Sequence, residues 1–172
     1  MIVGQGKFAR KCVQYHIIKA NLPDNQWFGT ILTLAGDSCT IVRMKIVADT
    51  NIFIAVALNE PKKNKIIQLT EGCDLIAPEV LPFEVGNALS AMAKKNILDT
   101  KELISAWEMV QRIPVELRHV DIKSALEIAL KFNIYAYDAY FLECAVSLRS
   151  PLITLDRGMK RVASNLGITI LE

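Results

Sequence analysis

From Met44 onward, the chain alternates between short apolar runs and longer stretches in which apolar residues recur every three or four positions. Short apolar runs closed by polar residues or proline are typical of buried strands, and the longer periodic stretches are typical of helices. The runs predict strands at 45–49, 73–77, 115–117, 152–155 and 168–171. The periodic stretches predict helices at 51–58, 61–71, 80–95, 100–113, 122–132, 137–148 and 156–166.

This alternation predicts an α/β fold, because strands separated by helices form right-handed βαβ units around a parallel sheet. We therefore expect a mostly parallel central sheet between two helical layers over residues 44–172. Helix caps are expected at Asp99 or Thr100 and at Asp121, and helix ends at Pro114 and Gly167. The stripe of Leu103, Trp107 and Val110 is interpreted as core.

Residues 1–43 show no sustained period and are interpreted as an atypical N-terminal extension. Gly4, Gly6 and Ala9 match the GxGxxA pattern of dinucleotide-binding folds, where glycines let the backbone approach a pyrophosphate. The pattern is weak by itself, and so short a segment cannot supply the rest of such a domain. A start codon placed too early, or a fusion remnant, explains it better, with Met44 as the functional start.

The composition indicates a compact globular protein, with 52% hydrophobic and 22% charged residues. The longest apolar run, residues 46–58, is interrupted by Asp49 and falls short of the ~20 residues that a membrane-spanning helix needs. No signal peptide pattern is present, so we expect a cytoplasmic protein without a membrane segment. The four cysteines form no CxxC pair, which disfavours a zinc site and favours buried thiols.

Acidic residues stand at suggestive places in this plan. Asp49 and Asp156 end two predicted strands and should face one crevice, because ligands of parallel sheets bind at the carboxyl ends of the strands. Asp138 opens a helix, and Glu84 shares a helix face with Asn87. Asp138 and Asp156 are equally consistent with helix caps, and Glu84 with an exposed position near a helix start. Asp49 is harder to explain away, because a buried carboxylate is costly unless it is paired or metal-bound.

Four segments, in order, together resemble the PIN-domain nucleases, and specifically the VapC-type toxins of toxin–antitoxin pairs. They lie at 46–51 (Ile-Val-Ala-Asp-Thr-Asn), 84–89 (Glu-Val-Gly-Asn-Ala-Leu), 137–140 (Tyr-Asp-Ala-Tyr, then Leu142) and 152–156 (Leu-Ile-Thr-Leu-Asp, then Ala163 and Gly167). Their order, spacing and predicted elements agree with the family over about three-quarters of the chain. Any one segment would be weak evidence. The four together are specific for the fold and the acidic site, and less so for the toxin role.

The resemblance implies that the metal-binding acids are Asp49, Glu84, Asp138 and Asp156. It also implies polar support from Asn51, Asn87 and Thr154. Clustered carboxylates need a cation to remain ionised, and hard oxygen ligands select Mg²⁺ or Mn²⁺ over zinc. Asp49 and Asp138 are expected to be the direct ligands, Glu84 to orient or deprotonate the attacking water, and Asp156 to bind a second metal.

The net charge of +2 does not by itself indicate a nucleic-acid binder, but the basic residues cluster locally. Arg157, Lys160 and Arg161 follow Asp156 and are candidate contacts to RNA phosphates, while Lys62, Lys63 and Lys65 form a second cluster. An ordinary solvated face explains either cluster equally well.

The function that the resemblance implies is a metal-dependent endoribonuclease with RNA as substrate, a cognate antitoxin as partner and a homodimeric state. The apolar helices after Pro61 and Val80 are candidates for the dimer interface. The rival interpretations are a PIN nuclease of RNA processing or decay without an antitoxin, a non-catalytic RNA-binding module, and a nucleotide-cofactor protein built on Gly4 and Gly6.

Overall fold

The computed structural model describes residues 15–17, 31–35 and 38–172. The chain divides into two compact units, Met1–Met44 and Lys45–Glu172. In the first unit, strands β1 (Tyr15–Ile17), β2 (Ile31–Ala35) and β3 (Ser38–Val42) pair antiparallel in the order β1-β2-β3. No strand was predicted there, so this small sheet is a feature that the sequence pattern did not reveal. The Gly4 and Gly6 motif lies outside the described residues, and the role of residues 1–43 stays a prediction.

The second unit is built on a four-stranded sheet in the order β6-β5-β4-β7. Its strands are β4 (Lys45–Ala48), β5 (Asp74–Pro78), β6 (Glu116–Arg118) and β7 (Leu152–Ile153). Each neighbouring pair is parallel, so the carboxyl ends of all four strands meet at one edge. Each central strand begins with one charged residue, Lys45 or Asp74, and is apolar from there on because helices cover both of its faces. Ile46, Val47 and Ile76 have no exposed surface.

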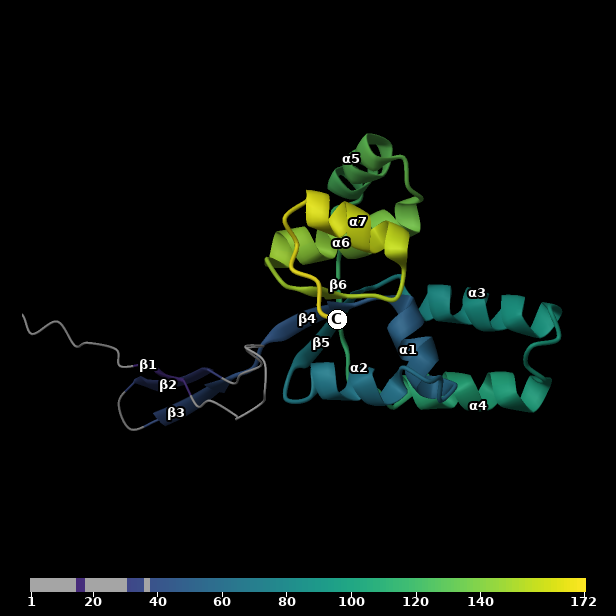
Figure 1. Ribbon diagram of the computed structural model, residues 1–172, viewed down its shortest axis with the longest axis horizontal. Helices are drawn as coiled ribbons and strands as arrows, with labels where there is room; N and C mark the ends of the chain where they lie inside the picture. The colour runs from purple at the N-terminus through teal and green to yellow at the C-terminus, as the bar shows by residue number, and fades with distance from the viewer. Residues whose placement is uncertain (1–14, 18–30, 36–37) are drawn as a thin grey trace, which may run out of the picture. The chain divides into compact units, whose positions relative to one another are not determined.

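Seven helices in Lys45–Glu172 form the outer layers and confirm the predicted three-layer α/β/α fold (Figure 1). They are α1 (Thr50–Ala57), α2 (Lys63–Thr70), α3 (Leu81–Lys94), α4 (Thr100–Gln111), α5 (Ile122–Phe132), α6 (Ala136–Leu148) and α7 (Arg157–Asn165). Helix α6 packs on β4 and β5, and α5 and α7 pack on α6. Helices α1 and α2 lie on the opposite side of the sheet, and α3 and α4 form a pair that packs against α1 (Figure 1).

The helix boundaries follow the expected capping chemistry. Asp99 and Glu102 form a reciprocal capping box at the start of α4, and the Asp121 side chain accepts a hydrogen bond from the backbone of α5. Gly167 follows α7 with a φ of 72°, a left-handed conformation that glycine adopts without strain. The predicted stripe on α4 is only partly core, because Val110 is buried but Trp107 and Leu103 are half-exposed.

The predicted strand at 168–171 is wrong as a strand. Only one bridge forms, between Leu152 and Ile170, with hydrogen bonds from Leu152 to Thr169 and from Leu171 back to Leu152. Strand β7 also ends two residues earlier than predicted, because Thr154 leaves the ladder and turns its side chain toward Asp49. No helix in the described part of the chain is both long and apolar enough to cross a membrane.

Candidate acidic site

Asp49 is the most buried acid of the molecule's described part, with 5% of its surface exposed. It follows β4 directly and occupies the N-cap position of α1, but its side chain makes no capping hydrogen bond. Its Oδ2 instead accepts hydrogen bonds from Thr154 Oγ1, at 2.6 Å, and from Asn51 Nδ2. Two side chains therefore orient the carboxylate, and the backbone of Thr50 also interacts with it.

A polar network ties the turn after β7 to this acid. Thr154 Oγ1 accepts a 3.0 Å hydrogen bond from the Asp156 backbone, and Asn51 Oδ1 accepts one of 3.0 Å from the Leu155 backbone. Thr154 is 1% exposed, so its hydroxyl works in a water-poor environment, where an orienting hydrogen bond is strongest. The structure thus brings Asn51 and Thr154 together with Asp49 from segments about a hundred residues apart in sequence.

Glu84 lies in the first turn of α3 and is half-buried. Its Oε2 accepts a 2.5 Å hydrogen bond from Thr50 Oγ1, which makes Thr50 an orienting residue that the sequence did not single out. The available signal was its place beside Asp49 in the first matched segment. Asn87, predicted to support Glu84, is exposed one turn further along α3, and its role stays a prediction.

The two remaining acids, Asp138 and Asp156, differ in whether they cap a helix. Asp138 is half-buried in the first turn of α6 and is not a cap, because Tyr135 occupies that N-cap position. Asp156 is exposed and does cap α7, with Oδ1 accepting a 2.6 Å hydrogen bond from the Met159 backbone. A Cβ atom at position 158 would lie 3.0 Å from that same Oδ1, so Gly158 leaves room for the cap.

The four acids influence one another electrostatically. Burial raises the pKa of Asp49 from 3.8 to about 6, the hydrogen bond from Thr154 opposes this rise, and the charges of Glu84 and Asp138 add to it. Burial also raises the pKa of Glu84 and that of Asp138. A neighbouring carboxylate raises each of these further, because the charge of Asp138 acts on Glu84 and that of Asp156 acts on Asp138. The structure therefore brings Asp49, Glu84 and Asp138 within electrostatic reach of one another, and Asp156 within reach of Asp138.

This donor set fits a hard divalent cation in its chemistry. Carboxylate oxygens are the preferred ligands of Mg²⁺ and Mn²⁺, and repulsion among partly buried carboxylates is relieved by a cation between them. The side chains are not closed into a ready-made cage, because no three His, Cys, Asp or Glu residues in the described part of the chain converge tightly enough to hold a metal ion. Asp138 is the centre of these couplings, because its charge acts on Asp49 and on Glu84 and the charge of Asp156 acts on it.

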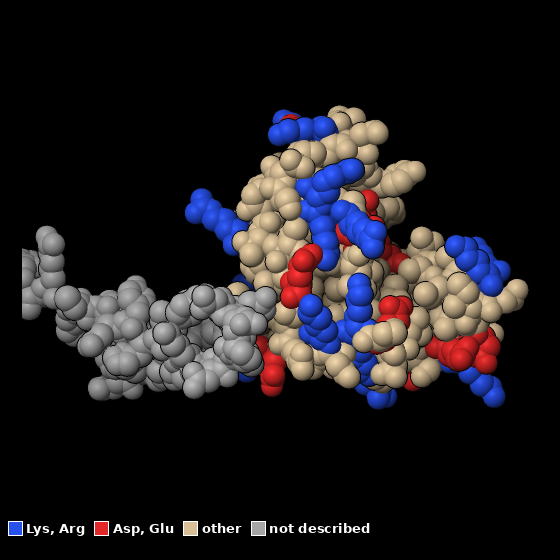
Figure 2. All heavy atoms as spheres, viewed as in Figure 1, with Lys and Arg blue, Asp and Glu red and all other residues tan. Residues whose placement is uncertain are grey.

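Basic side chains gather beside this site, on the face of α7 and α2 (Figure 2). A cavity of about 220 Å³ opens between these helices and is reached by Lys62, Lys65 and Lys160, with Thr154 on its wall. Lys160 forms a 2.6 Å ion pair with Glu172, whereas Arg157 and Arg161 are exposed. One residue of the first basic cluster, Lys160, and two of the second, Lys62 and Lys65, thus line one cavity, together with Glu172 and several apolar side chains.

The cysteines offer no competing chemistry among the residues whose side chains are described. Cys144 is buried, and burial raises the pKa of its thiol to about 12, so it remains protonated and inert. Cys73 is half-buried, and burial likewise raises its pKa. The side chains of Cys12 and Cys39 lie outside the described residues.

Comparison with known proteins agrees with this geometry. A model of the PIN domain matches residues 46–165, which is more than half of the chain, so the chain belongs to the PIN domain family. Ribonuclease VapC3 from Pyrobaculum aerophilum is 27% identical over 119 residues, covering 66% of this chain and 91% of the relative. The family resemblance expected from the four sequence segments is confirmed, and a VapC protein is among the relatives.

Two solved structures share the fold. The structure of PAE2754 from Pyrobaculum aerophilum superposes with a TM-score of 0.55 at 21% identity, covering 74% of this chain and 89% of that protein. The structure of VapBC2 from Rickettsia felis, bound to a DNA fragment from its promoter, gives 0.54 at 16% identity, with 74% and 97% covered. At these identities the likeness establishes the three-layer fold alone.

Proposed function

We propose that this protein is a metal-dependent endoribonuclease that acts as the toxin of a toxin–antitoxin pair. The observation that carries the proposal is Asp49, a buried carboxylate at the end of a central strand whose charge is opposed by Glu84 and Asp138 rather than neutralised by them. A buried carboxylate is costly without a cation, and carboxylates perturbed in this way concentrate at functional sites. Membership of the PIN family and the ribonuclease name carried by one relative support the same conclusion.

Asp49 and Asp138 are the proposed ligands of Mg²⁺ or Mn²⁺. A cation held there would supply Lewis-acid chemistry, lowering the pKa of a bound water and offsetting negative charge on the phosphate. Thr154 and Asn51 fix the direction of the Asp49 carboxylate by holding its Oδ2 atom. Asp156 is the proposed contact for a second metal that arrives with the substrate.

Glu84 is the proposed base for the attacking water. Burial and the Asp138 charge raise its pKa, which increases its affinity for the proton that the water loses. Thr50 holds one oxygen of Glu84, so the other oxygen can face the water. In this reaction a new bond forms between the water oxygen and phosphorus, the bond to the leaving oxygen breaks, and the proton of the water passes to Glu84.

The basic residues beside the acids are proposed to bind the RNA backbone on either side of the cut. Arg157 and Arg161 are exposed on α7 and free to reach phosphates, and Lys160 lines the cavity that Lys62 and Lys65 also reach. Phosphate contacts of this kind position a nucleic acid without reading its sequence. The RNA backbone would then run from this cavity toward the acids at the carboxyl edge of the sheet.

An antitoxin is the proposed partner that keeps the activity in check in the cytoplasm. One solved relative is a complex named VapBC2, which supports a paired protein for this fold. A basic side chain inserted among the carboxylates would neutralise them and exclude the metal at once. A homodimer is proposed as well, with Phe83 of α3, which is 76% exposed, at the interface.

The test is cleavage of a labelled mixture of structured and single-stranded RNAs by the full chain and by Asp49→Asn, each with Mg²⁺, Mn²⁺ or EDTA. The matched control is Glu127→Gln, which removes an exposed carboxylate from α5. Cleavage that requires metal, is lost in Asp49→Asn and persists in Glu127→Gln is the expected result. Cleavage that survives both EDTA and Asp49→Asn would show that this site is not the nuclease centre.

A further inference from the structure

A second cavity lies at the same edge of the sheet as the acids, on the side of β5 and β6. It has a volume of about 320 Å³ and is lined by Pro78, Glu79, Val80, His119, Val120, Ile122, Tyr137 and Tyr140. Pro78 is the last residue of β5, and His119 and Val120 directly follow β6. We call this the tyrosine cavity. The nuclease chemistry proposed above uses none of its residues.

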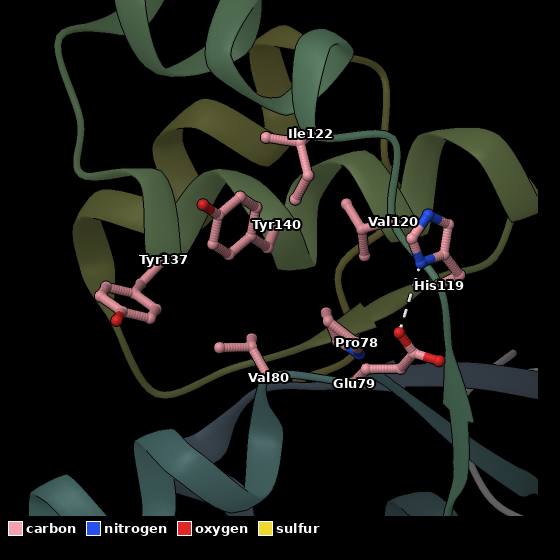
Figure 3. A pocket seen from close by; sticks show the side chains of 8 residues that line it. All are labelled: Pro78, Glu79, Val80, His119, Val120, Ile122, Tyr137 and Tyr140. Carbon is pink, nitrogen blue, oxygen red and sulfur yellow. Dashed lines mark hydrogen bonds and ion pairs between the residues drawn. The ribbon is translucent and has the colours of Figure 1, made fainter.

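The walls of the tyrosine cavity differ in character (Figure 3). Tyr137 and Tyr140 project from α6 with ring centroids 5.9 Å apart and an interplanar angle of 82°. Across the cavity from them lie Pro78 and Val80, at the turn into α3 (Figure 3). At the end away from Tyr137, His119 Nδ1 and Glu79 Oε2 are 3.3 Å apart, and both side chains are exposed. An aromatic and apolar interior is thus closed by a polar rim.

Two backbone connections join this cavity to the acids. Tyr137 is the neighbour of Asp138 in the first turn of α6. Val80 accepts a 3.1 Å backbone hydrogen bond from Glu84, so the floor of the cavity is one helical turn from that acid. In the strand order β6-β5-β4-β7, the cavity lies at the β6 and β5 end, while Asp49 and Thr154 follow β4 and β7. A strand of RNA lying along this edge would pass both.

The chemistry of the lining matches a nucleobase better than a peptide side chain. A flat aromatic ring can stack on tyrosine whatever its identity, and ligand cavities of a few hundred Å³ are lined mainly by apolar and aromatic groups with a few polar ones. The Glu79 carboxylate accepts hydrogen bonds only, so it favours a base that presents an amino group. Adenine, cytosine and guanine carry an exocyclic amino group with two donor hydrogens, whereas uracil offers only its single N3–H, so uracil is the weaker partner for a carboxylate already paired with His119.

We propose that the tyrosine cavity binds one unpaired base of the RNA substrate beside the phosphate that is cut, and that it disfavours uracil. The proposal rests on the proposed nuclease function and specifies its substrate as single-stranded RNA with a base preference at one fixed position. Tyr137 supplies the stacking surface, Tyr140 and Val80 bound the depth of the cavity, and Glu79 reads the edge of the base.

The test uses the full chain and a pool of single-stranded RNA with a randomised sequence, in which the ends of the products are sequenced. The wild type should show depletion of uracil at one position relative to the cut. Tyr137→Ala should abolish that depletion and slow cleavage roughly ten-fold, the order expected for the loss of one stacked base. Tyr137→Phe should keep both. The matched control is Tyr135→Ala, which removes a tyrosine that is 84% exposed, from the same helix start but outside the cavity.

A second measurement separates this proposal from the nuclease proposal, and a rim variant guards against misfolding of Tyr137→Ala. Fluorescence anisotropy in EDTA should show that the wild type binds oligocytidine more tightly than oligouridine. Glu79→Gln, at an exposed position, should remove that difference, because glutamine both donates and accepts. An absence of cleavage with this binding preference intact would reject only the nuclease. An unchanged base preference in Tyr137→Ala and Glu79→Gln would overturn the cavity proposal and leave the cavity to a protein partner.

Discussion

The Thr154 hydroxyl donates a 2.6 Å hydrogen bond to Asp49 from 105 positions further along the chain. The residue that follows the edge strand β7 therefore orients the acid that follows the central strand β4. Thr154→Val keeps the shape but removes this bond and leaves the Asp156 backbone without its 3.0 Å acceptor. We expect unfolding free energy to fall by about 1–3 kcal/mol in urea titrations, and the affinity for Mn²⁺ to fall with it. Thr154→Ser should restore both, and equal Mn²⁺ affinity in Thr154→Val would contradict an orienting role.

The raised pKa of Asp49 predicts a pH-dependent stability in metal-free protein. Below pH 3.8 the acid is protonated in the folded and unfolded states alike, so it imposes no penalty. Between 3.8 and about 6 the folded state binds the proton more tightly, so stability is lost as the pH rises through this window. Above it, the penalty levels off on the order of 2–3 kcal/mol.

Asp49→Asn removes that penalty and tests it directly. In EDTA, urea unfolding should show the variant to be more stable than the wild type at pH 7.5, with the difference shrinking toward pH 4. Glu127→Gln, an exposed change on α5, should follow the wild type at every pH. A constant difference across the whole range would assign the effect to packing rather than to ionisation.

Metal binding should reverse this penalty, because a cation stabilises the ionised acids and binds the folded state alone. We expect Mn²⁺ at saturating concentration to raise the Tm of the wild type by several degrees, on the order of a few kcal/mol of linkage. Asp138→Asn should lose most of this rise, and Glu127→Gln should keep it. Differential scanning fluorimetry with and without EDTA provides the measurement, and an equal rise in all three proteins would place the metal elsewhere.

The lysine-lined cavity predicts a particular dependence on salt. Each phosphate contact contributes about one unit, or slightly less, to the slope of log affinity against log salt concentration. Lys65→Ala should therefore weaken RNA binding several-fold at low salt and reduce the slope by about one. Lys101→Ala, an exposed lysine of α4, is the control and should change neither quantity. Titrations by anisotropy in EDTA at several salt concentrations give both quantities, and an unchanged slope in Lys65→Ala would mean that no phosphate lies there.

The proposed dimer predicts that a substitution at Phe83 changes the monomer–dimer equilibrium. Its side chain is 76% exposed on α3, and burying a phenylalanine contributes about 1.5–3 kcal/mol. Phe83→Arg should therefore shift sedimentation equilibrium toward the monomer. Leu130→Arg is the matched control, since Leu130 is 83% exposed but lies on α5. If both variants sediment like the wild type, α3 is not part of a dimer interface.

The sequence predicted the parts of this molecule that depend on local patterning. The strand at 45–48 is apolar and buried after its first residue, Lys45. Caps such as Asp99 and Asp121 mark helix starts because side-chain oxygens satisfy free backbone N–H groups. The prediction of a strand at 168–171 was wrong because an apolar run does not reveal how many ladder hydrogen bonds form. The hairpin of β2 and β3 was missed because its signals lay in a segment without a repeating pattern.

The site was predictable only in part, for a different reason. The acids could be located because strand ends and helix starts place them, but their partners depend on packing between distant segments. Thr50 beside Glu84 and Thr154 beside Asp49 are contacts between elements that no spacing rule connects. The tyrosine cavity was likewise invisible, because Glu79, His119 and Tyr137 meet only once β5, β6 and α6 are assembled.

The strand order β6-β5-β4-β7 places Asp49 and the tyrosine cavity on different strand ends of one edge. Under the two proposals made above, hydrolysis and the choice of RNA target would therefore depend on different residues. Substitutions at Glu79, His119 or Tyr137 alter a rim that carries none of the buried network around Asp49, so a lineage could change the RNA it attacks without passing through an inactive or unstable ancestor. In this arrangement the acidic site could stay unchanged during evolution while substitutions in the tyrosine cavity alter the RNA that is cleaved.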